Sequence, residues 1–306
     1  MIGKIKKNAR LLLRGNLAKG AAVTLIFLGV LVLFKGVETL CLLILDALGV
    51  SAAAQGIGGI GTLLSQLPLV SPINIAATVV VILLASFVIA PLYVGIKGWF
   101  YRLSEGQTVP VSAIFEPFSH AKTFFKSWFL MLDIFLRSFF WIYLCVLPGA
   151  LLGTTGFALL TARLTLKNGE LIGSLAAILG IILGILGLIL GVVIALRYSI
   201  APYLLCEDMT RSARYTIRTS VRYMRGNQGR MFGLLLSFVL WALFSGLILP
   251  TLYAFPYLQA SAAIFARYLI QKGTQENTEA SIEQEEFPKA TPDPDFDDIE
   301  QTNDLT

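Results

Sequence analysis

The chain has 306 residues, of which 56% are hydrophobic and only 14% are charged, against roughly a quarter in a typical globular protein. This composition excludes an ordinary water-soluble fold. The charges are also unevenly placed: residues 1–272 carry 23 basic and 8 acidic groups, a net charge of +15, whereas residues 273–306 carry one lysine against 11 acidic groups. We therefore expect a membrane domain over 1–272 and a disordered, acidic cytoplasmic tail over 273–306.

Long apolar runs predict an all-α, polytopic membrane bundle. A helix needs about 20 apolar residues to cross roughly 30 Å of hydrocarbon, and the chain has six such runs. They lie at about 21–45, 73–96, 128–152, 175–203, 231–249 and 252–270. Only Pro250 and Thr251 separate the last two, which predicts a tight helical hairpin. The first run is longer than the apolar core of a signal peptide, so we expect it to remain in the protein.

Basic residues collect on alternate connections between these spans. They precede the first span, they separate the second from the third (Lys97, Arg102, Lys122 and Lys126), and they separate the fourth from the fifth. We expect the protein to lie in the cytoplasmic membrane. The positive-inside rule then places these connections, and with them both termini, on the cytoplasmic side. Nucleic acid is not an expected partner, because membrane phosphate is the nearer anion for basic residues that flank apolar runs.

Each cytoplasmic connection contains a basic amphipathic segment, at about 2–19, 112–127 and 208–226. In the third, the arginines recur every three or four residues, within an arc of about 80°, beside an apolar stripe of Ala213, Ile217, Val221 and Met224. This pattern is typical of a helix lying in the membrane interface. The predicted ligands of anionic phospholipid headgroups are Arg10, Arg14, Arg211, Arg214, Arg218, Arg222 and Arg225. A purely topogenic role for these arginines is the alternative.

The first and third of these segments end in the same triplet, Arg-Gly-Asn, at residues 14–16 and 225–227. Gly and Asn both tolerate a left-handed backbone, and Asn can cap the helix that follows. The triplet therefore predicts a break between an in-plane helix and a crossing helix. Its recurrence suggests a duplicated unit.

Four blocks of sequence resemble a known family. They are IKKNARLLLRGN near the N-terminus, RYSIAPYLL at 197–205, SVRYMRGNQGRMFGLLLSFVLW at 220–241 and FPYLQASAAIF at 255–265. In this order they resemble the bacterial integral membrane proteins catalogued as domain of unknown function 975. The resemblance covers most of residues 2–272 and implies a multi-pass protein of the cytoplasmic membrane, with no assigned activity. The stretch between Pro148 and Arg197 is longer here than the family's usual link.

Several polar or small residues fall within the predicted spans. Asp133 and Arg137 lie four residues apart, so they can pair on one helix face, and Arg197 lies near the inner end of its span. They are either a structural group or part of a solute or proton path. The helix-packing candidates Gly180, Gly184, Gly187 and Gly191 form two G-x-x-x-G pairs. We expect their neighbour to be a helix of the same chain, with a homo-oligomer as the alternative.

Little in the sequence favours catalysis. Three scattered cysteines and one histidine offer no metal-ligand spacing, and no nucleophile motif or phosphate loop is present, so we expect no cofactor, no metal and no enzymatic activity. The leading hypothesis is a non-enzymatic membrane protein whose interfacial helices bind anionic lipid headgroups. The alternative is a small-solute transporter or permease subunit that uses Asp133, Arg137 and Arg197. An intramembrane enzyme ranks third.

Overall fold

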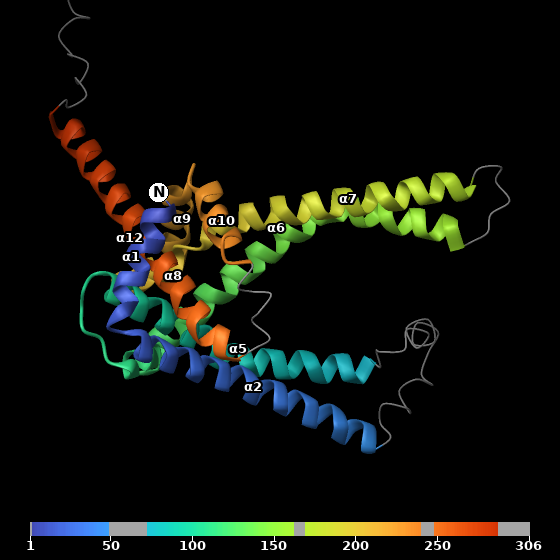
Figure 1. Cartoon of the computed structure of the whole chain (residues 1–306), viewed down its shortest axis with the longest axis horizontal. Coiled ribbons are helices and arrows are strands. Elements are labelled where there is room, and N and C mark those ends of the chain that lie inside the picture. The colour runs from blue at the N-terminus through green and yellow to red at the C-terminus, as the bar shows by residue number, and fades with distance from the viewer. Residues whose placement is uncertain (1, 49–71, 162–168, 240–247, 287–306) are drawn as a thin grey trace, which may run out of the picture.

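The computed structural model describes residues 2–48, 72–161, 169–239 and 248–286, and most of these residues are helical, without a strand among them. The elements form a compact body and two long helical hairpins that project from it in the same direction (Figure 1). One hairpin pairs α2 (Leu17–Ala47) with α5 (Pro72–Ser104), and the other pairs α6 (Ala121–Thr161) with α7 (Gly169–Ala195).

The hairpins have the properties of membrane-spanning segments. Four helical stretches within the described residues are long and apolar enough to cross a membrane: Leu17–Ala47, Ile73–Ser104, Ala121–Leu160 and Glu170–Glu207. Large apolar side chains cover their outer surfaces, such as Leu43 and Phe139, which are 62% and 59% exposed. Exposed apolar surface on this scale needs a lipid cover. These stretches contain the first four predicted spans.

The last two predicted spans are not among those four stretches. α10 (Gln228–Leu236) ends in a turn at Ser237 and Phe238, well before the expected end at 249, and residues 240–247 of that span lie outside the described residues. The predicted hairpin turn at Pro250 and Thr251 is wrong, because both residues lie in the first turn of α12 (Ile248–Glu286). A proline is compatible with that position, where its missing N–H has no helical partner to lose. α12 also continues through residues 273–286, which we had expected to be disordered.

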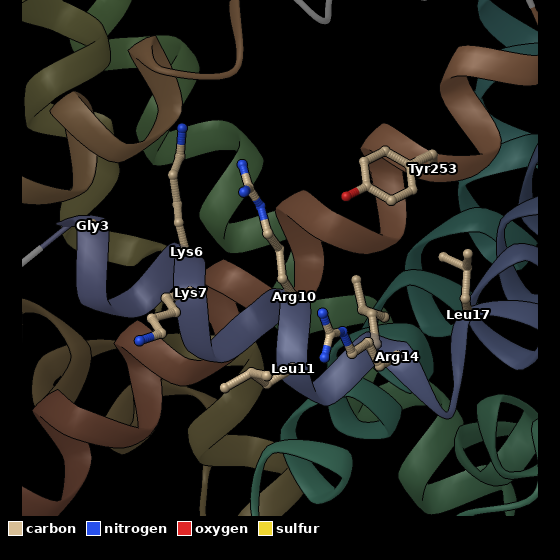
Figure 2. Close-up of a pocket in the computed structure, with 9 residues that line it drawn as sticks. Gly3, Lys6, Lys7, Arg10, Leu11, Arg14, Leu17 and Tyr253 are labelled. Carbon is tan, nitrogen blue, oxygen red and sulfur yellow. The ribbon is translucent and has the colours of Figure 1, made fainter.

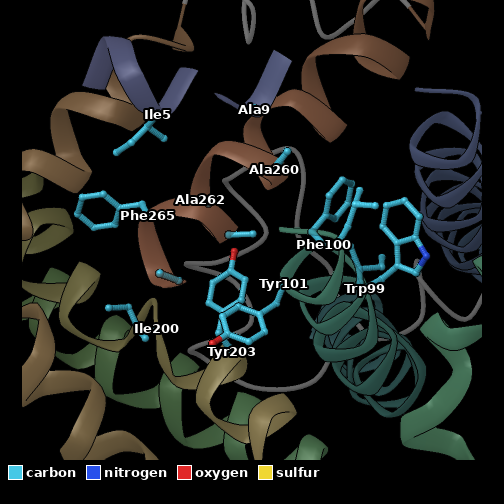
Figure 3. Close-up of a cluster of buried hydrophobic side chains, with 14 of the residues drawn as sticks. Ile5, Ala9, Trp99, Phe100, Tyr101, Ile200, Tyr203, Ala260, Ala262 and Phe265 are labelled. Carbon is cyan, nitrogen blue, oxygen red and sulfur yellow. The ribbon is translucent and has the colours of Figure 1, made fainter. Parts of the chain in front are cut away.

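The body contains the short elements and the inner ends of the hairpins. Its short elements are α1 (Ile2–Arg14), the 3-10 helices η2 (Val111–Phe118) and η3 (Leu196–Tyr198), α8 (Ala201–Glu207), α9 (Ala213–Met224) and α10. Small residues of α12, such as Ala260 and Ala262, are buried among aromatic side chains of α5 and α8 (Figure 3). Tyr101 and Tyr203 lie with ring centroids 6.0 Å apart. The body is thus a packed protein core rather than a set of helices covered by lipid.

The two junctions that carry the Arg-Gly-Asn triplet share a pattern of backbone hydrogen bonds. The N–H groups of Asn16 and Asn227 donate to the carbonyls of Leu13 and Met224, and the two asparagine carbonyls accept from the residues four positions later, Gly20 and Met231. Gly226 adopts the expected left-handed conformation, with φ of 76°, whereas Gly15 does not have a positive φ. Neither asparagine side chain caps the helix that follows. The side chain of Asn16 instead donates to the Leu12 carbonyl of the preceding helix, at 3.3 Å.

The middle amphipathic segment is not one helix. η2 ends at Phe118, Ser119 and His120 form a bend, and α6 begins at Ala121, so the expected helix at 112–127 is divided. Pro117 has no N–H for a helical hydrogen bond, which favours an early end. η2 packs so closely on α5 that a methyl group at Gly95 would overlap the carbonyl of Ile114.

Candidate functional site

The amphipathic pattern of α1 fixes how its basic residues are presented. Ile5, Ala9 and Leu13 recur every four residues and are buried in the core that contains α12. The rest of α1 is consequently turned outward. Its basic residues Lys4, Lys7, Arg10 and Arg14 are all exposed.

Two basic residues of α1 contact aromatic rings of the body. The Nε of Arg10 donates to the Tyr257 hydroxyl at 3.1 Å, and the guanidinium lies 5.5 Å from the centroid of that ring. The ammonium of Lys6 lies 4.5 Å from the centroid of Phe238 and donates to the Ser237 carbonyl at 3.3 Å. Burial and the nearby charge of Arg10 lower the pKa of Lys6. These contacts hold cations together on one side of α1.

The outer side of α1 and Tyr253 of α12 enclose a pocket of about 580 Å³. Figure 2 shows Lys6 and Arg10 extending from the same side of α1, with the hydroxyl of Tyr253 turned toward Arg10. The lining contains four cations and no carboxylate, so it suits an anion. It comprises Gly3, Lys6, Lys7, Arg10, Leu11, Leu13, Arg14, Leu17 and Tyr253.

The predicted site residues on α1 included Arg10 and Arg14 but missed Lys6, Lys7 and Tyr253. The two lysines precede the arginines on the same helix, so charge density alone could have included them. Tyr253 comes from the other end of the chain, and no local pattern connects it to α1.

The arginines of α9 divide into two groups. Arg214, Arg218, Arg222 and Arg225 are exposed, as an interfacial role requires. Arg211 lies outside the helix, ahead of the N-cap Ser212, and is paired with Asp208 at 3.1 Å and with Glu207 at 3.8 Å. Hydrogen bonds from Thr210, together with the charge of Arg211, lower the pKa of Asp208, so Arg211 faces an ionised partner. Its placement with the other four as a headgroup ligand is therefore not supported.

The apolar stripe of α9 packs against protein. Ile217 is buried with residues of α5, α6 and α8, Met224 is buried in the core with α12, and Ala213 and Val221 pack beside Ile217. The stripe therefore anchors the helix to the body, whereas we had expected it to enter lipid. The other face carries the exposed arginines. Arg222 and Arg225 reach a smaller pocket of about 250 Å³, which also contains Lys272 and Glu276 of α12.

The intramembrane cluster is only partly formed. Arg137 and Asp133 are paired at 2.7 Å on α6, as predicted, with side chains 49% and 33% exposed. Arg197 of η3 forms no ion pair with either within the described residues. The backbone carbonyl of Arg197 accepts from the Ser220 hydroxyl of α9 at 2.8 Å, whereas its side-chain Nε is buried without a hydrogen-bond partner among the described residues. The ion pair within the described residues thus joins Asp133 and Arg137 and does not include Arg197.

The glycines of α7 face α6 of the same chain. A methyl group at Gly180 would overlap the backbone of Gly153, and one at Gly187 would overlap that of Cys145. At Gly191 it would lie 2.8 Å from the Cα of Ile142. Gly184 contributes its bare backbone to the contact with Gly149. This face is occupied within the chain, and a second copy would need another surface.

The described residues offer few side chains that could bind a metal ion. Residues 2–48, 72–161, 169–239 and 248–286 contain no group of three His, Cys, Asp or Glu side chains placed to hold a metal ion. The three cysteines are free.

The sequence matches a family model over residues 3–272, which is most of the chain and contains all four of the blocks quoted above. Neither the curated proteins nor the solved structures include a match to the chain. The chain belongs to the family described as "Protein of unknown function (DUF975)".

Proposed function

We propose that this protein is a non-enzymatic, multi-pass protein of the cytoplasmic membrane that binds anionic phospholipid headgroups through the pocket on α1 and the exposed arginines of α9. Both termini lie in the cytoplasm in this proposal. The observation that carries it is the pocket itself, in which four cations gather without a carboxylate.

The position of the basic residues supports the proposal. The hairpins expose apolar surface along their length, whereas α1 and α9 belong to the body at one end of both hairpins (Figure 1). When the hairpins lie in the hydrocarbon, the outer sides of α1 and α9 are near the level of the phosphates. Basic residues near an anionic leaflet contribute about 1 kcal/mol each at low salt.

The apolar part of the pocket rim also fits a lipid. Leu11 and Leu17 are 54% and 39% exposed beside the cations. A headgroup contacting Lys7 and Arg14 would place its acyl chains against these leucines, a combination that a free phosphate does not use. Tyr253 adds a hydroxyl and an aromatic ring, which are common at the membrane interface.

Native mass spectrometry of the full chain, purified with phosphatidylglycerol, tests the proposal. The double variant Lys7→Gln with Arg14→Gln should retain fewer anionic lipids than the native protein. The matched control, Lys4→Gln with Lys122→Gln, removes the same charge from exposed cytoplasmic positions outside the pocket and should retain the native number. An equal loss of retained lipid in the two variants would show that only the total charge matters. The basic residues would then have only the topogenic role.

A further inference from the structure

α5 carries a lysine into the middle of the body. Lys97 is only 8% exposed, although we had placed it in a cytoplasmic connection. Its ammonium donates to the Tyr203 hydroxyl at 3.1 Å and lies 5.0 Å and 5.1 Å from the ring centroids of Tyr93 and Tyr203. No carboxylate within the described residues forms an ion pair with it. An ammonium has three donors, and burying one without an anion is costly.

Lys97 lines a cavity of about 240 Å³ at the meeting point of seven elements. The lining is mostly apolar and contains no acidic residue: Tyr93, Lys97, Met131, Ile134, Ala195, Leu196, Tyr198, Ser199, Pro202, Met231, Leu235, Leu258, Gln259 and Ala262. Three of the four blocks that carry the family resemblance contribute to it, from η3 and α8, α10 and α12. It is separate from the pocket on α1, with which it shares no residue.

Two further polar atoms in this cavity have no hydrogen-bond partner among the described residues. Gln259 is 4% exposed, and its side-chain Oε1 accepts no hydrogen bond from the described residues. The hydroxyl of Ser199 is likewise buried and unpartnered. Buried polar atoms in native proteins are nearly always hydrogen-bonded, to protein, water or ligand. The cavity therefore combines an unneutralised cation, an acceptor that needs a donor, and an apolar wall.

We propose that this cavity binds a small apolar 2-hydroxycarboxylate. Its carboxylate lies against the Lys97 ammonium and supplies the missing negative charge. Its hydroxyl, next to the carboxylate, donates to the Oε1 of Gln259, and its hydrocarbon part packs against Met131, Ile134 and Leu258. An amino acid of the same skeleton fits less well, because its ammonium would add a second positive charge to a cavity without a carboxylate. An inorganic phosphate would leave the apolar wall uncovered.

Isothermal titration calorimetry of the full chain in phosphatidylcholine nanodiscs tests this site, with 2-hydroxyisocaproate, isocaproate and leucine as probes. The hydroxy acid should bind more tightly than isocaproate, which lacks the hydroxyl, and more tightly than leucine. Lys97→Met should weaken its binding by at least about tenfold, since a charge-assisted hydrogen bond is lost. Lys122→Met, which removes an exposed lysine on α6, should leave its affinity unchanged. Absence of binding of the hydroxy acid, or tighter binding of leucine, would overturn the proposal.

Two more variants separate loss of the site from loss of the fold. Gln259→Leu should weaken binding of the hydroxy acid while leaving the affinity for isocaproate at its native value; an equal loss for both probes would contradict the assigned role. Lys97→Met should also raise the thermal midpoint of the ligand-free protein, because a buried charge without an anion is removed. A lower midpoint would show that Lys97 stabilises the core through Tyr203, and the proposal would then be wrong.

Discussion

The Nε of Arg10 donates to the hydroxyl of Tyr257 across 247 positions of the chain, and so connects α1 to α12. The same arginine lies over the ring that carries this hydroxyl. Arg10 therefore has a structural partner besides the pocket that it lines. The predictions below separate such structural contacts from those available to lipid.

Removal of the Tyr257 hydroxyl should loosen α1. We predict that Tyr257→Phe lowers the free energy of unfolding by about 1 kcal/mol, the net value of a typical hydrogen bond, because the hydroxyl accepts from Arg10 and donates to the Lys6 carbonyl at 3.5 Å. Thermal unfolding in detergent measures the change. Tyr268→Phe, at an exposed position of the same helix, is the control and should have no effect. An unchanged midpoint for Tyr257→Phe would mean that the hydrogen bond does not hold α1 in place.

Substitution by alanine should change the stability of the protein differently at two glycines of α7. Gly187→Ala places a methyl group on the backbone of Cys145 and should cost about 1–3 kcal/mol, since a close-packed contact is overfilled. Gly184→Ala meets no atom within 4 Å and should be neutral or slightly stabilising, because alanine favours a helix. Thermal unfolding of the two variants side by side measures the difference. Equal changes in stability for the two variants would show that α6 does not pack against α7 as described.

Asp133 and Arg137 should be coupled. Asp133→Asn or Arg137→Gln leaves one charge unpaired within a span, at a cost of about 2.5–3.5 kcal/mol for a lone charge near the middle of a bilayer. The double variant should be milder than the sum of the two single variants, because it leaves no charge behind. A double-mutant cycle of unfolding in lipid nanodiscs gives the coupling. Additive effects would show that the two residues have other partners.

The exposed arginines of α9 should contribute to binding of anionic membranes without contributing to stability. We predict that Arg214→Gln with Arg218→Gln weakens association of the nanodisc-reconstituted protein with phosphatidylserine vesicles at low salt, by about 1 kcal/mol per arginine, and that 1 M salt removes the difference. Arg211→Gln should show the reverse pattern, with native vesicle association and a lower thermal midpoint, because Arg211 is paired with Asp208. Loss of vesicle association on changing Arg211 alone would contradict this division.

The hairpin tips should face the outside of the cell. In a variant whose three native cysteines are replaced by alanine, an impermeant thiol reagent added to sealed cells should label Glu170→Cys, at the start of α7, and should miss Ser112→Cys, in η2. Labelling only of Ser112→Cys would reverse the orientation, and α1 would then face the wrong leaflet for the proposed function.

The hairpins were predictable from sequence because lipid exposure demands long, continuous apolar runs, and α2, α5, α6 and α7 supply them. The body was not. The run over residues 252–270 is long enough for a span, but no part of α12 is among the described stretches that are apolar enough to cross a membrane, and α1 and α5 cover it. Gln259 and Arg267, two polar residues within that run, were the available signals.

The candidate sites depend on contacts between distant segments, which explains what the sequence pattern missed. Helical spacing put Arg211 with the other arginines, although the N-cap Ser212 begins the helix after it. Lys97 follows directly on the expected end of a span at Ile96, where a lysine usually reaches toward water. α5 instead continues to Ser104, and the aromatic residues around Lys97 come from α5 and α8.

The packing of α1 on α12 also sets an order of events during synthesis. Ile5, Ala9 and Leu13 leave the ribosome long before Tyr257 and the small residues of α12 that share their core. The glycine contacts of α6 and α7 need no such wait, because the two helices are neighbours in the chain. The α6–α7 hairpin can therefore assemble while α1 still has no protein to cover its apolar stripe. In that interval a membrane surface is the nearest support for the basic, amphipathic α1, until α12 arrives and closes the body.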